Sequence, residues 1–309
     1  MLGRRSFLSW VAVAVGGCAP VAPSPTRPTP SPRPTTPPTL SPAPAAPSPE
    51  DQLAELERSL GGRVGVYAVD TVNGETLSHR ADARFAMCST FKWALAAAVL
   101  EKVDRGEESL SEMVRYTEAD LLEYAPVTRG HLAERQLTVE ALCEAAVTLS
   151  DNTAANLLLD RVGGPAGLTA FLRQHGDDAT RLDRDEPTLN TNIEGDPRDT
   201  TTPRAMATTL NELVLGSALK EESRGRLVGW LRGCKTCDQR LWAGLPDGWT
   251  AGTKTGTCLR GGCNDVGLVW PPDREPIVVA AYLSDSDATL PERSAALASV
   301  GRIVAARFG

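Results

Sequence analysis

The sequence contains only three histidines among 309 residues, and His79, His131 and His175 lie far apart. A protein zinc site needs three or four histidine, cysteine or carboxylate ligands at characteristic spacings. One Cys-x-x-Cys pair is present, Cys234 and Cys237, but no second pair and no histidine cluster accompanies it. We therefore expect no metal site, and no pattern in the sequence implies an organic cofactor.

A basic excess and a long apolar run are also missing. The net charge is −7, and residues 1–50 hold four arginines against one acidic residue, so the acidic excess lies in residues 51–309. Nucleic-acid binding needs a basic footprint, so we expect no nucleic-acid partner. No run of residues is apolar and long enough to span a membrane. With 41% apolar and 23% charged residues, the chain is typical of a soluble globular protein with one large domain or two lobes.

Residues 1–18 are predicted to be an export signal rather than part of the fold. Arg4 and Arg5 begin a segment that resembles a twin-arginine signal. Residues 15–18 (Val-Gly-Gly-Cys) resemble a lipobox, in which Cys18 is lipidated and becomes the mature N-terminus. Plain signal cleavage near Ala19 is the alternative. The protein is expected in the periplasm or at the cell surface, with membrane contact only through a lipid on Cys18.

Residues 19–50 read as a tether, because 13 of the 23 prolines lie between positions 20 and 49. A polyproline-like segment of this length reaches at most ~90 Å, at ~3.1 Å per residue. Such a tether holds a soluble domain away from a membrane; a disordered remnant without a spacing role is the alternative. The folded domain is predicted over residues 51–309, and we expect a monomer.

Strand patterns occur at both ends of this domain and helical patterns lie between them. A hairpin is predicted around residues 71–74, between two apolar strands. The middle, 89–240, is mostly helical, apart from a long polar loop over 176–203. Further predicted elements are helices at 51–60, from Thr138, through 155–162 and at 292–308, and strands at 250–258, 264–270 and 277–283.

This order predicts an α/β (α+β) fold in which both ends of the chain build one antiparallel sheet covered by the terminal helices. The α/β lobe comprises residues 51–88 and 241–309, and residues 89–240 form a second, all-helical lobe. A cleft between two lobes is the expected place for a site.

The first candidate for chemistry is the pair Ser89 and Lys92, just before an alanine-rich helical run. At i and i+3 the two side chains lie on one helix face. A desolvated lysine has a lowered pKa and can serve as a base for a serine nucleophile. The alternative is a serine N-cap followed by a surface lysine.

Two further motifs follow in the chain, Ser150-Asp-Asn152 and Lys254-Thr-Gly256. Together with Ser-x-x-Lys they resemble, in order and spacing, the motif set of class A β-lactamases and penicillin-binding proteins. The resemblance extends to STFKWALAAAVL, LSDNTAANLLLDRVGGP, RLDRDEPTLN, GDPRDTTTP and AGTKTGT. It covers nearly all of residues 55–309. The chain is therefore identified as a member of the class A serine β-lactamases, whose two-lobed fold contains a five-stranded antiparallel sheet.

The resemblance implies roles for individual residues. Ser89 would attack the lactam carbonyl, and Lys92 would orient or deprotonate the Ser89 hydroxyl. Ser150 would relay a proton to the lactam nitrogen, with Lys254 nearby supplying positive charge. The backbone N–H groups of Ser89 and Thr257 would form the oxyanion hole. The substrate would be held by Tyr124, Asn152, Thr255, Gly256 and Thr257.

Glu186 and Asn190, in the long polar loop, match the residues that hold the deacylating water in this family. Whether the lysine or the glutamate is the acylation base is disputed. A solvated charge run is the other interpretation of residues 183–186. Arg184 and Asp199 match a family salt bridge at the base of this loop.

Some positions depart from the family pattern. No arginine occurs in residues 262–265, where many members carry one that binds the substrate carboxylate. Arg240 matches an alternative arginine, and Arg260 is a weaker candidate. Asp185 replaces a common tryptophan, and Thr253 replaces a common aspartate before the Lys-Thr-Gly motif.

Export implies an oxidising compartment in which cysteines can pair. Cys88 and Cys258 resemble the disulfide of class A carbapenemases, and two small buried thiols are the alternative. Cys143 lacks its family partner, since Ala96 stands there, and is expected to be a lone buried thiol. Three disulfides remain open: Cys263 could pair with Cys234 or with Cys237, or Cys234 could pair with Cys237.

These features imply hydrolysis of penicillins and cephalosporins, with carbapenems as a hypothesis. A peptidoglycan peptidase inhibited by penicillin would lack the deacylating glutamate. A lipoprotein that sequesters β-lactams, being acylated once, is the alternative of another class, and the Asp185 and Thr253 departures leave it open.

Overall fold

The computed structural model describes residues 11–26 and 46–309, which belong to two units divided after Ala45. Residues 11–26 are exposed and contain no helix or strand. The Arg4-Arg5 motif and residues 27–45 of the predicted tether lie outside the described residues. In the described part of the chain, no helix has the length and hydrophobicity needed to cross a membrane.

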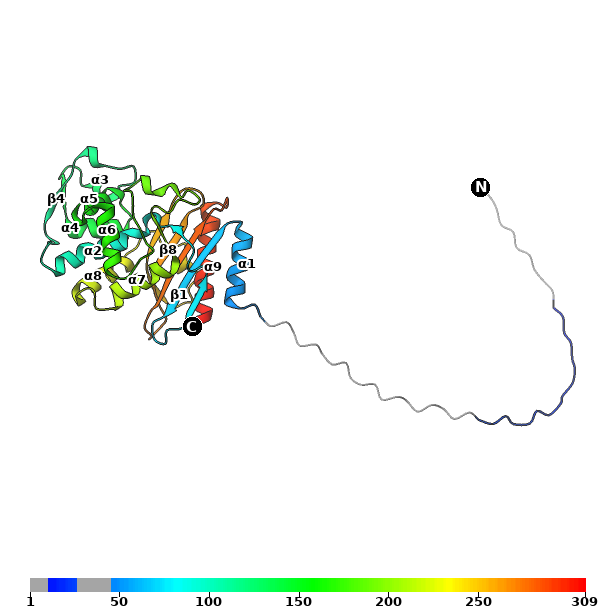
Figure 1. The fold of residues 1–309 in the computed structure, drawn as a ribbon. Coiled ribbons are helices and arrows are strands. Elements are labelled where there is room, and N and C mark those ends of the chain that lie inside the picture. The colour runs from blue at the N-terminus through cyan, green and yellow to red at the C-terminus, as the bar shows by residue number, and fades with distance from the viewer. Residues whose placement is uncertain (1–10, 27–45) are drawn as a thin grey trace, which may run out of the picture. The chain divides into compact units, whose positions relative to one another are not determined.

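A five-stranded antiparallel sheet forms the centre of residues 46–309 (Figure 1). The strand order β2-β1-β9-β8-β7 places the two ends of the domain side by side, because β1 pairs with β9 along its whole length. The predicted hairpin joins β1 to β2. The strands are β1 (Arg63–Asp70), β2 (Thr76–His79), β7 (Thr250–Thr257), β8 (Cys263–Trp270) and β9 (Ile277–Ser284).

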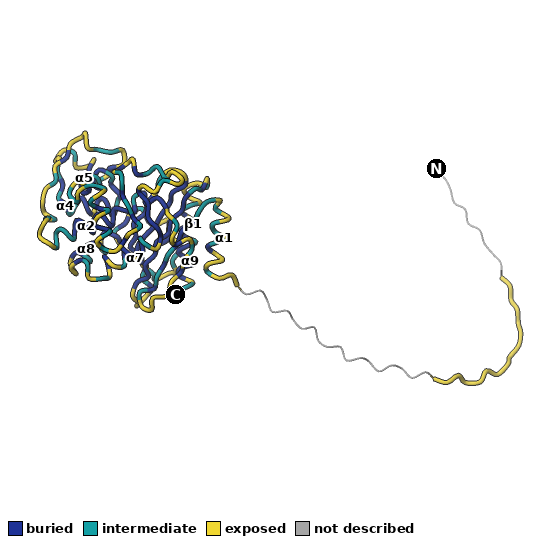
Figure 2. Tube along the Cα trace, viewed as in Figure 1, coloured by how far each residue is buried: buried dark blue, intermediate teal, exposed yellow. Residues whose placement is uncertain are grey.

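The sheet separates two hydrophobic cores, and strand β9 contributes to both. All of its residues are buried, and side chains alternate between the faces of a strand. Val278, Ala280 and Tyr282 pack toward the helices on one face. Their neighbours Val279 and Ala281 pack into the core on the opposite face. The continuous apolar run of β9 is therefore a central strand that is buried on both faces of the sheet (Figure 2).

The terminal helices α1 (Pro49–Leu60) and α9 (Leu290–Phe308) cover the outer face of the sheet (Figure 1). Helix α1 begins two residues earlier than predicted, because Ser48 and Asp51 form a capping box around its first turn. Folded structure therefore starts inside the range predicted for the tether.

The helical lobe is built around α2 (Phe91–Asp104), whose residues 91–100 are all buried. Alanines along this helix let neighbouring helices approach closely. Helix α4 begins after its N-cap Thr138, as predicted, whereas α5 begins at Asn152, upstream of the predicted range 155–162, because the Asp151 side chain caps it. The other helices of this region are α3 (Pro126–Gly130), α4 (Val139–Thr148), α5 (Asn152–Val162), α6 (Gly164–Gln174) and α8 (Glu221–Arg232).

One boundary differs from the prediction. Helix α7 (Pro203–Leu215) lies within the range predicted for the helical lobe, yet it packs against β1 and β9 (Figure 1). Gly65 permits this approach, since a Cβ there would lie 2.9 Å from the ring of Pro203. The helical pattern predicts an amphipathic helix but not which neighbour covers its apolar face.

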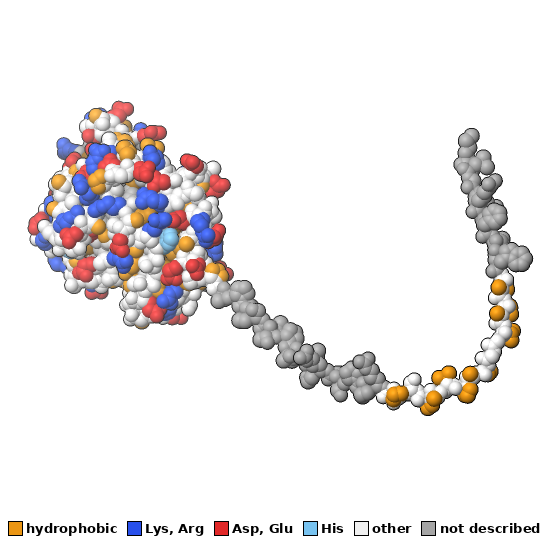
Figure 3. All heavy atoms as spheres, turned by 45° about the vertical axis from the view of Figure 1, so that its right-hand side comes forward, with side chains coloured by type: hydrophobic (Ala, Val, Ile, Leu, Met, Phe, Trp, Pro, Cys, Tyr) orange, Lys and Arg blue, Asp and Glu red, His pale blue; other side chains and the backbone are white. Residues whose placement is uncertain are grey.

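Short elements complete the domain. The 3₁₀ helices are η1 (Cys88–Thr90), η2 (Glu118–Asp120), η3 (Thr188–Thr191) and η4 (Leu241–Gly244). Two-stranded ladders pair β3 (Phe85–Ala86) with β6 (Thr200–Thr201), and β4 (Met113–Arg115) with β5 (Gln136–Thr138). On the face shown in Figure 3, acidic and basic side chains are interspersed and no single sign dominates.

Candidate active site

Ser89 lies in η1, immediately before the first turn of α2. The N-terminus of a helix stabilises developing negative charge, so this position suits a nucleophile whose target becomes an oxyanion. Cys88 precedes it with a φ of 48°, in the left-handed region, and is linked by a disulfide to Cys258 just after β7. The segment that carries Ser89 is thereby joined covalently to the end of an edge strand.

Lys92 points from the same turn into the interior and is fully buried. Its Nζ lies 3.0 Å from Glu186 Oε1 and donates hydrogen bonds to Asn152 Oδ1 at 2.5 Å and Ser150 O at 2.9 Å. Burial lowers the pKa of Lys92, and the Glu186 carboxylate opposes this effect. A desolvated lysine held by three acceptors can exchange a proton with groups beside it.

Ser150 occupies the turn between α4 and α5 with a φ of 60°. The next residue, Asp151, fixes this turn, because its buried carboxylate caps α5 at Ala154 N and accepts from Val127 N and Thr128 N. Ser150 Oγ consequently lies between two lysines, 3.4 Å from Lys92 Nζ and 3.1 Å from Lys254 Nζ. A hydroxyl in this position can pass a proton in either direction.

Lys254 extends from β7 and is also fully buried. Burial, followed by the charge of Lys92, lowers the pKa of Lys254 to about 7. Its Nζ donates to Thr255 O at 2.8 Å as well as to Ser150. The charge of this side chain therefore changes within the neutral pH range.

Glu186 lies on the long loop between α6 and α7, and its carboxylate is fully buried. Ser89 Oγ donates to its Oε1 at 3.3 Å, and Asn190 Nδ2 donates to its Oε2 at 2.6 Å. One carboxylate is thus in contact with both the serine and Lys92. The charge run at residues 183–186 is not simply a solvated surface, because its last member points into the site.

Two sets of contacts hold this loop in place. Arg184 Nε lies 2.6 Å from Asp199 Oδ2, and Asp199 Oδ1 accepts from the N–H groups of Asp183 and Arg184 at 2.8 and 2.9 Å. Asn156 bonds both main-chain groups of Glu186, at 3.0 Å and 2.9 Å. No sequence motif marks Asn156, although its position four residues after Asn152 places both on one face of α5.

The other end of the site is basic. Arg240 is buried and donates to Gly256 O at 2.8 Å, Asn264 O at 2.7 Å and Thr257 Oγ1 at 2.5 Å. Its guanidinium is therefore fixed beside the Lys-Thr-Gly strand, where an incoming carboxylate could be bound. Arg260, the weaker candidate, is half exposed, lies near Glu194 and is not among the described residues that line the cleft.

A cleft of about 450 Å³ collects these groups. Thr236 and Leu290, which sequence reasoning missed, also line it, and Thr236 Oγ1 lies 2.5 Å from Thr255 Oγ1. The residues along the cleft are Ser89, Tyr124, Ser150, Asn152, Asn190, Thr236, Arg240, Thr255, Gly256, Thr257 and Leu290.

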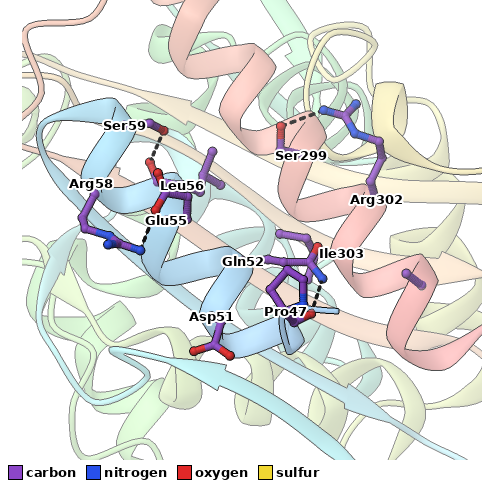
Figure 4. A pocket seen from close by; sticks show the side chains of 11 residues that line it. Pro47, Asp51, Gln52, Glu55, Leu56, Arg58, Ser59, Ser299, Arg302 and Ile303 are labelled. Atoms are coloured by element: carbon purple, nitrogen blue, oxygen red, sulfur yellow. Dashed lines mark hydrogen bonds and ion pairs between the residues drawn. The ribbon is translucent and has the colours of Figure 1, made fainter. Parts of the chain in front are cut away.

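A larger hollow of about 730 Å³ lies between α1 and α9. Figure 4 shows two pairs among its polar side chains, Arg58 with Glu55 and Arg302 with Ser299. Among the described residues that line it, no lysine or histidine lies beside the serines to serve as a base. The smaller cleft is therefore the candidate active site.

The remaining cysteines of the described residues are unpaired. Cys143 is a buried free thiol, as predicted from the missing partner at Ala96. Cys234, Cys237 and Cys263 are also free and buried, so none of the three pairings considered for them is formed.

Comparisons with known proteins agree with this geometry. Residues 48–308 match the model of the family described as "Beta-lactamase enzyme family". Beta-lactamase CTX-M-8 of Citrobacter amalonaticus is 46% identical over 255 residues, 82% of this chain and 87% of the relative. A beta-lactamase of Streptomyces albus G is also 46% identical, over 265 residues and 84% of each chain.

Solved structures give the same result. An ancestral class A beta-lactamase superposes with a TM-score of 0.83 at 56% identity, covering 84% of this chain and all of the other. A putative class A enzyme, PenP from Rhodopseudomonas palustris, has a TM-score of 0.82 at 50% identity, covering 84% and 99%. The chain belongs to the class A serine β-lactamases, hydrolases that act on the β-lactam amide bond.

Proposed function

We propose that the protein hydrolyses penicillins and cephalosporins through an acyl-enzyme on Ser89, which is deacylated by a water activated by Glu186. The observation that carries this proposal is the position of the buried Glu186 carboxylate, 3.3 Å from Ser89 Oγ and 3.0 Å from Lys92 Nζ. A glutamate in contact with the nucleophile itself can act on a water that attacks the ester formed there.

In acylation, Ser89 Oγ bonds to the lactam carbonyl carbon and gives its proton to Lys92 or Glu186. The tetrahedral oxyanion is stabilised by the backbone N–H groups of Ser89 and Thr257. The C–N bond of the ring then breaks, and Ser150 Oγ passes a proton to the nitrogen. Lys92, which takes the Ser89 proton directly or from Glu186, replaces the proton that Ser150 has given up, and Glu186 is left ionised for deacylation.

In deacylation, Glu186 accepts a proton from water as the water oxygen attacks the ester carbonyl. The Ser89–acyl bond breaks, Ser89 regains a proton, and the ring-opened acid leaves. Asn190, bonded to the same carboxylate, helps to hold the water. The substrate carboxylate is bound by Thr255, Thr257 and Arg240, with Asn152 on the side-chain amide and Tyr124 at the cleft edge.

Carbapenem hydrolysis is a second proposal, supported by the Cys88–Cys258 disulfide, which joins the nucleophile segment to β7 across 170 residues of sequence. A cross-link that closes a long loop stabilises by about 2–5 kcal/mol. It also restricts movement of Ser89 relative to the strand that binds substrate. We expect Cys258→Ser to lower carbapenem turnover and the unfolding midpoint, whereas Cys143→Ala, at an unpaired thiol, changes carbapenem turnover little. Unchanged turnover and stability in Cys258→Ser would remove the disulfide from the argument.

The decisive experiment counts turnovers of a penicillin and of a carbapenem per molecule of purified protein. Many turnovers of penicillin, abolished by Ser89→Ala and kept by Ser299→Ala on the surface of α9, support the hydrolase. One stoichiometric burst followed by silence means sequestration instead. Release of D-alanine from a peptidoglycan pentapeptide, with a persistent penicillin adduct, favours the peptidase.

For the cellular location, we propose export followed by lipidation of Cys18, with residues 19–48 as the spacer to a monomeric domain. Cys18 is exposed in a segment without helix or strand, which leaves it accessible to a modifying enzyme.

A further inference from the structure

The segment from Cys234 to Cys237 follows α8 and brings two free thiols together. Both side chains are buried, with 6% and 2% of their surface exposed. Cys237 Sγ donates to Cys234 O at 3.4 Å, so the second thiol folds back onto the first residue. The interaction with the Cys237 side chain lowers the pKa of Cys234 and raises that of Cys237. The Cys234 sulfur is therefore the nucleophilic member of the pair at neutral pH.

The pair is connected to the candidate active site through the residue between the cysteines. Cys234 Sγ lies 3.4 Å from Thr236 Oγ1, which in turn lies 2.5 Å from Thr255 Oγ1. Both threonines line the cleft. Beyond the pair, Cys237 O accepts from the backbone N–H of Arg240 at 3.1 Å. A change at these sulfurs therefore reaches two groups assigned to the substrate carboxylate.

We propose that Cys234 and Cys237 form an oxidation site, at which a peroxide converts the two thiols into a disulfide and weakens substrate binding through Thr236 and Arg240. Neither cysteine is one of the residues assigned to catalysis. The effect of the oxidation on kinetics rests on the proposed β-lactam hydrolysis. A small peroxide suits the location, because the cleft leads to Thr236 while the sulfurs are nearly covered.

The chemistry balances with one hydrogen peroxide. The Cys234 thiolate attacks one peroxide oxygen, the O–O bond breaks, and sulfenic acid and water form after proton uptake. The Cys237 sulfur then bonds to the Cys234 sulfur and displaces the hydroxyl, which leaves as a second water. Two thiols are oxidised by two electrons and one peroxide is reduced.

Closing the bond changes the local contacts. The sulfurs must approach to about 2.0 Å, so the Cys237 thiol can no longer donate to Cys234 O. The Cys234 sulfur must also turn toward its new partner and away from Thr236. Loss of one positioning hydrogen bond corresponds to a rise in KM of about 2- to 10-fold.

The other free thiols of the domain provide matched controls. Burial raises the pKa of Cys143 in α4 and of Cys263 in β8, which keeps both protonated and unreactive. Cys143→Ala is therefore expected to respond to peroxide as the unmodified protein does. Cys237→Ser keeps a hydroxyl donor in place but cannot form the bond.

The direct measurement is a tryptic map without reduction, which the sequence makes decisive. Trypsin cuts after Arg232, Lys235 and Arg240, so the two cysteines fall in separate peptides, 233–235 and 236–240. The whole protein, purified with mild reductant that leaves the Cys88–Cys258 disulfide intact, is treated with hydrogen peroxide and then alkylated. The proposal requires these two peptides to appear linked, in the unmodified protein and in Cys143→Ala but not in Cys237→Ser.

The kinetic measurement uses a penicillin before and after peroxide treatment. We expect KM to rise about 2- to 10-fold with a smaller change in kcat, and Cys237→Ser to show no such rise. Separate peptides with oxidised or unmodified cysteines would overturn the proposal. Linked peptides with unchanged KM would overturn its effect on binding. A failure of the untreated enzyme to turn over penicillin concerns the proposed function alone, because the peptide map does not depend on activity.

Discussion

At the scale of single residues, the site depends on burying two lysines within reach of one serine hydroxyl. An isolated buried ammonium is strongly disfavoured. Lys92 is compensated by the Glu186 carboxylate and the Asn152 oxygen, whereas among the described residues the hydrogen-bond partners of Lys254 are Ser150 and a backbone carbonyl. This difference separates their roles, with Lys92 in the nucleophile unit and Lys254 as a titrating charge.

The first prediction concerns Glu186→Gln. The amide keeps the shape of the side chain but cannot accept the proton of water. Deacylation therefore becomes slower than acylation, and the acyl-enzyme accumulates. We expect kcat for penicillin to fall by about 10²- to 10⁴-fold. Intact-protein mass spectrometry should show the acyl adduct accumulating on the variant. Asp185→Asn, at the exposed neighbouring carboxylate, is the matched control and should turn over normally. Normal turnover in Glu186→Gln would assign deacylation to another group.

The second prediction follows from the pKa of Lys254, which burial lowers to about 7. As pH rises through this value the side chain loses its proton, and with it the charge that attracts the substrate carboxylate. We expect kcat/KM to fall as pH is raised from about 6 to about 9. In Lys254→Arg the guanidinium stays protonated, so this alkaline decline should disappear. The exposed Lys235→Arg is the control and should retain it. The same decline in all three proteins would assign it to a different group.

At the scale of elements, the loop between α6 and α7 positions Glu186 although it has almost no regular structure. Its backbone groups bond to side chains instead of to a ladder, chiefly to Asp199 and Asn156. The polar composition that predicts a loop therefore also supplies the groups that order it.

The third prediction tests this with Asp199→Asn. The change removes the charge that pairs with Arg184 and replaces Oδ2, the oxygen that accepts from Arg184 Nε, with an amide NH2 group, while Oδ1 can still accept from the loop backbone. Breaking a buried pair costs about 3–5 kcal/mol, and the 20% exposure of Arg184 reduces this to about 2–4 kcal/mol. Urea unfolding should show the loss, together with slower deacylation. Asp196→Asn, whose partner Arg198 is half exposed on the same loop, should change both little. Equal effects at the two aspartates would show that the loop is not held at Asp199.

The elements also show what local sequence can predict. The hairpin at 71–74 and the helix start at Thr138 depend on nearby residues, and they are present. Long-range partners are different. The packing of α7 on the sheet and the contact of Asn156 with Glu186 join residues that no local pattern relates. The Cys88–Cys258 disulfide was predictable only through the family resemblance, since spacing alone leaves cysteine pairing open.

At the scale of the whole molecule, the domain places its site between a sheet built from both chain ends and a helical region built from the middle. Ser89 and Ser150 come from the helical side, while Lys254 and Thr255 come from β7. The cysteine that would carry a lipid lies outside this domain, at residue 18. Attachment to a membrane and catalysis are therefore separable.

The last prediction uses this separation. Cys18→Ala should move the protein from the membrane fraction to the soluble exported fraction and abolish labelling by a radioactive fatty acid. Its kcat and KM for penicillin should stay unchanged, because the described residues that line the cleft all lie at or after Ser89 in the chain. Cys143→Ala, which removes a cysteine inside the domain, should remain labelled and membrane-bound. If the unmodified protein is already soluble and unlabelled, the segment ending at Cys18 acts as a plain export signal. The tether then does not connect the domain to a membrane.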